Sequence, residues 1–172
     1  YWRDWSSDVC SSDLSFGGKE FNSVVLGASV QEGRWRASIS AREIEGYLDW
    51  QPAIAGGSAG ALSGRLARLQ ISRSREREIE NLLDRGPVRL PSLDIEADRL
   101  VLSDRELGRL RLQADNAGEG ERPEWRLRAL SIDHPGGTLA GSGVWEAGTD
   151  GVRRTSLDFQ LDVRDPARVL DT

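Results

Sequence analysis

Hydrophobic and polar residues alternate along most of this chain, and this period of two is typical of β-strands with one apolar face. The alternation is clearest near the C-terminal end, where Leu157, Phe159, Leu161 and Val163 are separated by polar residues. The pattern predicts strands at residues 24–30, 35–39, 44–50, 62–71, 93–102, 107–114, 125–132, 138–146 and 155–163.

The alternation changes phase inside two of these strands. Apolar positions shift by one residue near Ala67, between Leu66 and Leu69, and a β-bulge would produce such a shift. A similar change of face occurs between Ala129 and Leu130.

The chain also repeats itself with a period of roughly 90 residues, which is typical of repeating β architectures. Residues 16–28 align with residues 102–114 without a gap, and the apolar positions coincide. Further along the two copies, Trp35 aligns with Trp125, and Trp50 aligns with Trp145. We therefore predict two β repeats, at residues 15–71 and 89–164.

Two segments depart from the strand pattern. Residues 72–88 mix charges of both signs, which predicts a surface excursion with a short helix at 76–83. Near the C-terminus, Asp165 followed by Pro166 is a helix start signal, so residues 165–172 are expected to begin a helix that the chain does not complete.

The first residues read differently again. Residues 4–14 match the translation of a common sequencing adapter, so we expect residues 1–14 to be foreign to the natural protein and disordered. The only cysteine, Cys10, lies in this stretch, so disulfide and thiol chemistry are not expected of the remainder.

Composition and charge narrow the functional classes. The net charge is −5 and no basic stripe is present, which argues against nucleic-acid binding. His134 is the only histidine and lies in a predicted turn, so neither a histidine metal cluster nor a Ser-His-Asp triad is expected. Asp158 and Asp162 share the polar face of one strand, where solvation explains them better than acid–base chemistry. We predict no enzyme activity, no metal and no cofactor.

The tryptophans allow two interpretations. Trp35 and Trp125 open equivalent strands, and Trp50 and Trp145 close equivalent strands. They could cap the ends of a hydrophobic layer, or they could lie at the rim of an apolar trough, where an amphipathic ring suits a lipid headgroup boundary.

With these residues in view, the chain resembles an internal fragment of the YhdP-like branch of the AsmA superfamily of envelope bridge proteins. The segments that carry the resemblance are residues 90–97, 107–112, 125–127, 142–145, 155–161 and 164–170.

The resemblance implies an all-β fold, in which long antiparallel strands form a curved open sheet of repeating β-groove type. It also implies transport of phospholipid between the inner and outer membranes, in support of the outer-membrane permeability barrier. The parent protein would lie in the periplasm, anchored in the inner membrane, and parts absent from this chain would contact both membranes. The residues expected to line the groove and contact phospholipid acyl chains are Val24, Leu26, Trp35, Ala37, Ile39, Leu110, Leu112, Trp125, Leu127, Leu157, Phe159 and Leu161.

The alternative is a closed β-sandwich, which would act as an envelope scaffold or an adhesin-type binding module. The two hypotheses differ in whether a second sheet covers the apolar face of the repeat strands.

Overall fold

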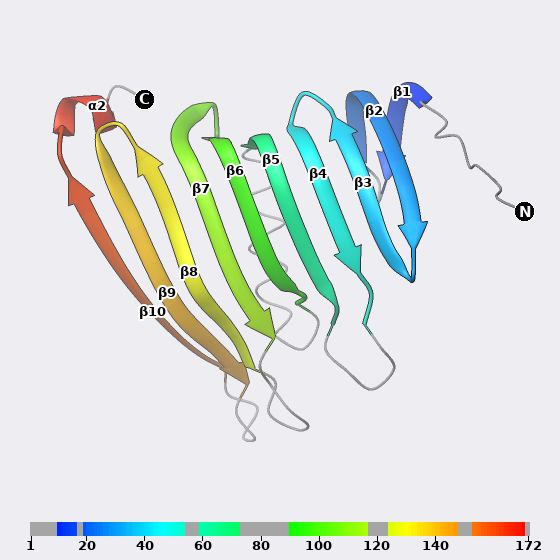
Figure 1. The fold of residues 1–172 in the computed structure, drawn as a ribbon. Coiled ribbons are helices and arrows are strands. Elements are labelled where there is room, and N and C mark those ends of the chain that lie inside the picture. The colour runs from blue at the N-terminus through cyan, green and yellow to red at the C-terminus, as the bar shows by residue number, and fades with distance from the viewer. Residues whose placement is uncertain are drawn as a thin grey trace, which may run out of the picture.

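The strands of the described residues form one open β-sheet of ten strands (Figure 1). The computed structural model describes residues 10–16, 19–53, 59–72, 90–116, 124–147 and 153–170, and side-chain surroundings are described from Leu26 onward. The strands, in chain order, are β1 (Cys10–Phe16), β2 (Lys19–Gln31), β3 (Arg34–Ser40), β4 (Ile44–Gln51), β5 (Ala61–Ile71), β6 (Ser92–Leu102), β7 (Arg105–Asn116), β8 (Glu124–His134), β9 (Gly137–Ala147) and β10 (Arg153–Val163).

The order of the strands in the sheet is their order in the chain. Every neighbouring pair is antiparallel except β5 and β6, which are parallel. Strands β1 and β10 form the two free edges, and Figure 1 shows them at opposite sides of the sheet. The predicted mainly β, largely antiparallel and open sheet is confirmed.

The parallel pair divides the sheet into two sets of five strands, β1–β5 and β6–β10. Because five antiparallel strands return the chain to its starting direction, the parallel joint makes β6 run in the same direction as β1. Residues aligned by the sequence repeat fall on corresponding strands: Trp35 and Trp125 on β3 and β8, and Trp50 and Trp145 on β4 and β9. The repeat boundaries, 15–71 and 89–164, stay predictions, and the helix expected at 76–83 lies outside the described residues.

The N-terminal strand differs from the expectation for residues 1–14. Residues 10–14 belong to β1, which pairs with β2 in antiparallel register. The proposal that residues 1–14 are a disordered foreign segment therefore finds no support here.

Both predicted changes of face correspond to irregularities in strand pairing. On β5, Leu66 and Arg68 pair with adjacent residues of β4, which leaves Ala67 as the extra residue of a bulge. On β8, Leu127 and Ala129 pair with adjacent residues of β7, so Arg128 is the extra residue there. Because of each bulge, the apolar residues that follow it lie on the same face of the sheet as the apolar residues that precede it.

Hydrophobic packing is concentrated where the two sets of strands meet. A buried cluster joins β5, β6 and β7, and its members are Leu66, Ile95, Ala97, Leu100 and Leu110. Their burial makes these three strands the core of the described structure.

The helix start predicted at residue 166 is confirmed. Helix α2 (Pro166–Leu170) follows Asp165, whose Oδ1 accepts hydrogen bonds from the backbone N–H groups of Ala167 (3.1 Å) and Arg168 (3.4 Å). Proline at the first helical position and aspartate before it satisfy the helix N-terminus in the usual way.

Candidate functional site: the apolar face of the sheet

The strand register assembles the alternating apolar residues into rows that cross the sheet. Directly paired residues on adjacent strands point to the same face, so each chain of pairs defines one row. One row runs from β2 to β10 through Leu26, Ile39, Gly46, Leu66, Ala97, Leu110, Ile132, Leu139 and Leu161. A second runs through Ala28, Ala37, Leu48, Gly64, Ile95, Leu112, Leu130, Gly141 and Phe159. A third runs through Val30, Trp35, Trp50, Leu62, Leu93, Ala114, Leu127, Gly143 and Leu157.

We call the surface formed by these three rows the apolar face. All but two of the residues predicted to line a groove belong to the rows themselves. Trp125 lies two positions before Leu127 on β8 and so shares its face, while for Val24 only the position on β2 is described. The structure thus brings the predicted residues with described side chains together on one surface.

Accessibility varies sharply along this face. In the centre, Leu66 is 5% exposed, and Leu110 and Leu127 are also buried. On the edge strand β10, by contrast, Phe159 is 56% exposed and Leu161 is 63% exposed. The residues available to a ligand therefore lie toward the flanks of the sheet, whereas the central ones contribute to packing.

The exposed side chains of β10 lean over β9. A Cβ atom placed on Gly141 would lie 2.5 Å from Cδ1 of Phe159, and one placed on Gly143 would lie 2.5 Å from Cδ2 of Leu157. Both glycines leave room for a side chain from the neighbouring strand, as in aromatic cover of a strand glycine. The two side chains therefore continue the apolar face over the backbone of β9.

The tryptophans of the described residues form two cross-strand pairs on the apolar face. Trp35 pairs with Trp50 on β3 and β4, and Trp125 pairs with Trp145 on β8 and β9. The second pair is engaged within the protein, because Nε1 of Trp125 donates a hydrogen bond to the carbonyl oxygen of Pro91 (3.0 Å) and Trp145 is 8% exposed. In the first pair, Trp35 is 51% exposed.

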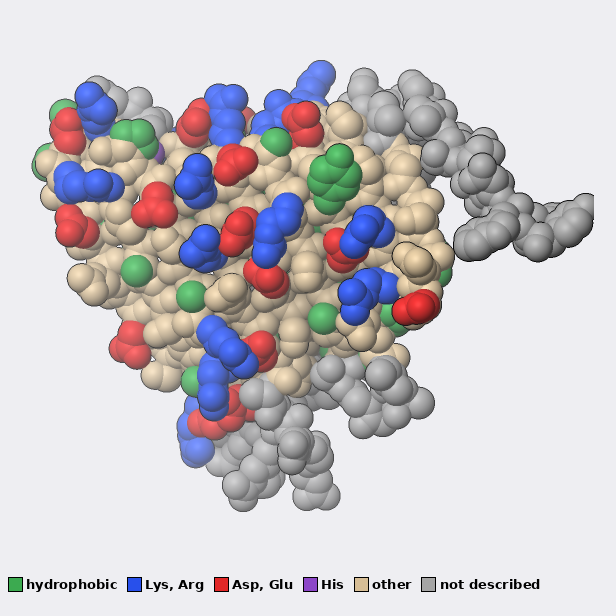
Figure 2. Space-filling view, in the orientation of Figure 1, with side chains coloured by type: hydrophobic (Ala, Val, Ile, Leu, Met, Phe, Trp, Pro, Cys, Tyr) green, Lys and Arg blue, Asp and Glu red, His purple; other side chains and the backbone are tan. Residues whose placement is uncertain are grey.

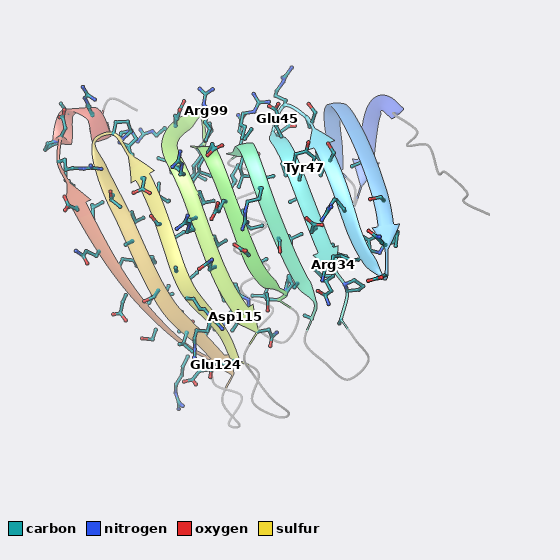
Figure 3. The ribbon with its side chains drawn as sticks, in the orientation of Figure 1. Arg34, Glu45, Tyr47, Arg99, Asp115 and Glu124 are labelled. Carbon is teal, nitrogen blue, oxygen red and sulfur yellow. The ribbon has the colours of Figure 1, made fainter. Side chains whose placement is uncertain are left out.

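The opposite face of the sheet is charged, and Figure 2 shows basic and acidic side chains interspersed across it. Arg36 pairs with Asp49 (2.9 Å), and Glu96 lies between Arg65 (3.7 Å) and Arg111 (3.1 Å). Figure 3 labels further members of this face, including the aromatic Tyr47 on β4. We call this surface the polar face.

The charge pairs of the polar face keep Arg65 cationic. The side-chain hydrogen bond to Asp94 is the largest cause that raises the pKa of Arg65 above its ordinary value, and the charges of Asp94 and Glu96 add to the effect against partial desolvation. Because the raised pKa lies far above neutrality, any stabilisation it provides is present throughout the physiological range and is lost only in strong alkali.

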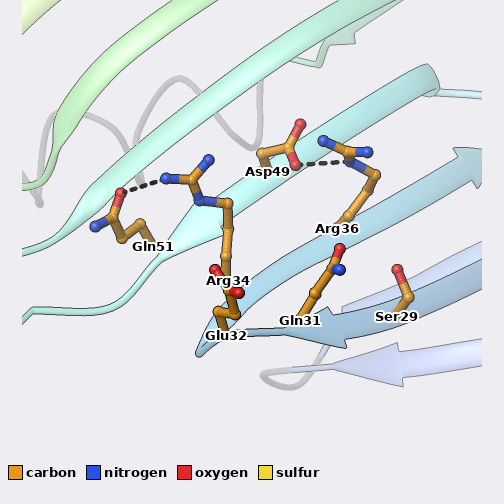
Figure 4. A pocket seen from close by; sticks show the side chains of 7 residues that line it. All are labelled: Ser29, Gln31, Glu32, Arg34, Arg36, Asp49 and Gln51. Atoms are coloured by element: carbon orange, nitrogen blue, oxygen red, sulfur yellow. Dashed lines mark hydrogen bonds and ion pairs between the residues drawn. The ribbon is translucent and has the colours of Figure 1, made fainter.

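A shallow hollow of about 250 Å³ lies on the polar face beside the hairpin that joins β2 and β3 (Figure 4). Its lining is formed by Ser29, Gln31, Glu32, Arg34, Arg36, Asp49 and Gln51. Arg36 is held by Asp49, while Nη2 of Arg34 reaches the side-chain oxygen of Gln51 at 3.5 Å.

Sequence reasoning omitted two exposed members of the apolar face from the predicted lining. Val30 and Val163 are both accessible at the ends of β2 and β10. Each continues the alternation of its strand, so the periodicity already contained the signal that places them on this face.

Within the described ranges, no group of three or more His, Cys, Asp or Glu side chains is arranged to hold a metal ion. The same residues contain no helix with the length and apolar character needed to cross a bilayer.

Comparison with known proteins identifies one family. The model of the YhdP protein family matches residues 3–172, and the match includes most of the segment that was expected to be foreign. No curated protein and no solved structure matches the chain. Since the family match extends over nearly the whole sequence, the chain belongs to the YhdP protein family.

Proposed function

We propose that the apolar face binds the acyl chains of phospholipids, and that this chain is part of a conduit for phospholipid between the inner and outer membranes. One observation carries the proposal: an open sheet places apolar side chains that are more than half exposed, Phe159 and Leu161 among them, on the same face as its core. Contiguous exposed apolar surface on a protein usually marks a site of interaction with a ligand, a protein or a membrane.

The rows suit a mobile ligand better than a fixed one. Each row crosses the nine strands from β2 to β10, and at about 4.8 Å between strands it extends roughly 38 Å. Each methylene transferred from water to such a surface contributes about 0.8 kcal/mol, so a few contacts at a time hold a chain without trapping it. We infer a passive mechanism, in which acyl chains slide along the accessible apolar side chains at the flanks of the sheet while headgroups remain hydrated.

The polar face is suited to contact with water. Its paired charges keep that side solvated, so a ligand has one apolar surface to occupy. Membership in the YhdP family is the basis for proposing a periplasmic location, with the parent protein anchored in the inner membrane and membrane contacts supplied by parts outside this chain.

The alternative function as a closed β-sandwich scaffold or adhesin-type module requires a second sheet over the apolar face. All strands of the described residues belong to one sheet, so they do not provide that second layer. The open arrangement therefore favours the lipid proposal over the sandwich.

Native mass spectrometry with added phospholipid tests the proposal through a matched pair on β10. Phe159 points to the apolar face and Gln160 to the polar face, and both are exposed. We expect Phe159→Asp to lower phospholipid occupancy severalfold and Gln160→Asp to leave it unchanged. Equal occupancy in the two variants, with both folded by circular dichroism, would contradict the proposal.

Leu112→Asp is a poorer test of binding, although Leu112 is a predicted lining residue. Its side chain packs against the central cluster, so a charge there would disrupt folding and binding together.

A further inference from the structure

We infer that a bound phospholipid lies along the strands, with its headgroup at the end of the apolar face that carries the tryptophans and its chain ends toward the opposite end. This inference rests on the proposed function and assigns an orientation to the ligand within it. We call the first end the tryptophan end.

All tryptophans of the described residues lie at one end of the apolar face. Trp35 and Trp125 are the second residues of β3 and β8. These strands begin where the antiparallel strands β4 and β9 end, and Trp50 is the penultimate residue of β4 and Trp145 the third from last of β9. The opposite end of the same face is aliphatic, and its members include Ile44, Leu69, Ile71 and Val163.

Indole rings concentrate where apolar and aqueous surroundings meet. The ring body is apolar and the N–H group is polar, which is why tryptophan accumulates at the headgroup level of bilayers. On the apolar face, the tryptophans at one end and the aliphatic residues at the other resemble the headgroup boundary and the hydrocarbon of one bilayer leaflet. The asymmetry gives the face a headgroup end and a chain end.

The two tryptophan pairs are not equally available for this role. Trp125 is bonded to the backbone of Pro91 and Trp145 is buried, so these two stabilise the second set of strands. Trp35 is half exposed and Trp50 is partly exposed. The headgroup boundary is therefore assigned to Trp35 and Trp50, at the ends of β3 and β4.

The length of the apolar face agrees with this orientation. On β8, Trp125 and Ile132 pair with Asn116 and Leu110 of β7, which lie six residue steps, or about 20 Å, apart at the rise of an antiparallel strand. One leaflet of a bilayer has about 15 Å of hydrocarbon, half of the usual thickness. An acyl chain that starts at the tryptophan end therefore finishes on the face.

Photo-crosslinking with two phospholipid probes tests the orientation on the unaltered protein. One probe carries a diazirine on the headgroup and the other carries it near the end of an acyl chain, and peptide mass spectrometry locates the labels. We expect the headgroup probe to label residues 30–36 and 49–53 at least severalfold more than residues 39–44 and 66–71, which lie at the opposite ends of β3, β4 and β5, and the chain-end probe to show the reverse preference.

The outcomes separate the orientation from the binding itself. Labelling of the apolar face with the two preferences exchanged, or with no preference, would overturn the orientation and leave the proposed function standing. Labelling of neither end, or labelling that unlabelled phospholipid fails to compete away, would overturn both.

Variants of the first tryptophan pair provide a second readout. Replacing both Trp35→Ala and Trp50→Ala should reduce headgroup labelling at the tryptophan end severalfold, with less effect on labelling by the chain-end probe. Tyr47→Ala is the matched control, because Tyr47 is an exposed aromatic residue on the polar face of β4, and it should change neither pattern. Unchanged headgroup labelling in the folded double variant would contradict the assignment to this pair.

Discussion

Strands β6 and β10 have the same alternation of apolar and polar residues, but the apolar side chains of the two strands differ in their exposure. On β6, Ile95 and Ala97 are buried in the central cluster. On β10, Phe159 and Leu161 occupy the same two rows, and more than half of each side chain is exposed. A common pattern therefore yields the stabilising core at the centre of the sheet and an accessible apolar surface at its edge.

This difference shows that side-chain type alone does not decide which apolar residues are accessible to a ligand. Side chains of β5 and β7 pack against those of β6, whereas β10 has a neighbouring strand on one side only. Matched substitutions on central and edge strands test this difference in packing.

The largest effect is expected from a charge in the centre. Ile95→Asp places a carboxylate in the buried cluster, whose apolar side chains cannot solvate it. This substitution should lower the free energy of unfolding by more than about 4 kcal/mol. Circular dichroism during urea unfolding measures the change. Phe159→Asp is the matched control and should stay within about 1 kcal/mol of the wild type, so equal destabilisation of both variants would break the comparison.

Truncation should reproduce the contrast at smaller magnitude. Leu66→Ala removes a buried side chain and should cost about 2–5 kcal/mol, because the cavity collapses only in part. Leu161→Ala, in the same row on β10, removes a mostly exposed side chain and should cost under about 1 kcal/mol. Similar losses at the two positions would show that β10 is packed like the centre.

A glycine substitution tests the cover that β10 provides over β9. Gly141→Val introduces a Cβ into the space of the Phe159 ring and should destabilise the protein by about 1–3 kcal/mol. In a double-mutant cycle, Phe159→Ala should remove much of that cost, because the ring is the obstacle. Additive effects would mean that the ring does not lie over Gly141.

The smallest effect is expected on the polar face. Arg36→Ala breaks an ion pair with Asp49 whose partners are both substantially solvated, so the free energy of unfolding should fall by at most about 1 kcal/mol. Phospholipid occupancy measured by native mass spectrometry should not change. A marked loss of occupancy would place the ligand on the polar face instead of the apolar one.

Most of the described sheet follows from the sequence because periodicity is a local property. The alternation located nine strands, and its phase shift near Ala67 marked a bulge that strand pairing confirms. The helix start followed from Asp165 and Pro166 for the same reason, since a cap depends on neighbouring residues.

Three features could not be predicted in this way. Strand β1 was missed because residues 10–14 were set aside as foreign. The parallel pairing of β5 and β6 depends on the path of the chain between them, about which alternation says nothing. Alternation also assigns a residue to a face without saying what covers it, so Leu127, which is buried, and Leu161, which is exposed, looked equivalent as lining residues.

The central claim is that the apolar face of β10 remains available to a phospholipid chain. An environment-sensitive fluorophore can be attached at Leu161→Cys or at Gln160→Cys, each in a Cys10→Ser background, because these adjacent residues point to opposite faces. On addition of phospholipid, we expect a blue shift of emission at position 161 and none at position 160. Equal responses at the two positions, or a response at position 160 alone, would contradict it.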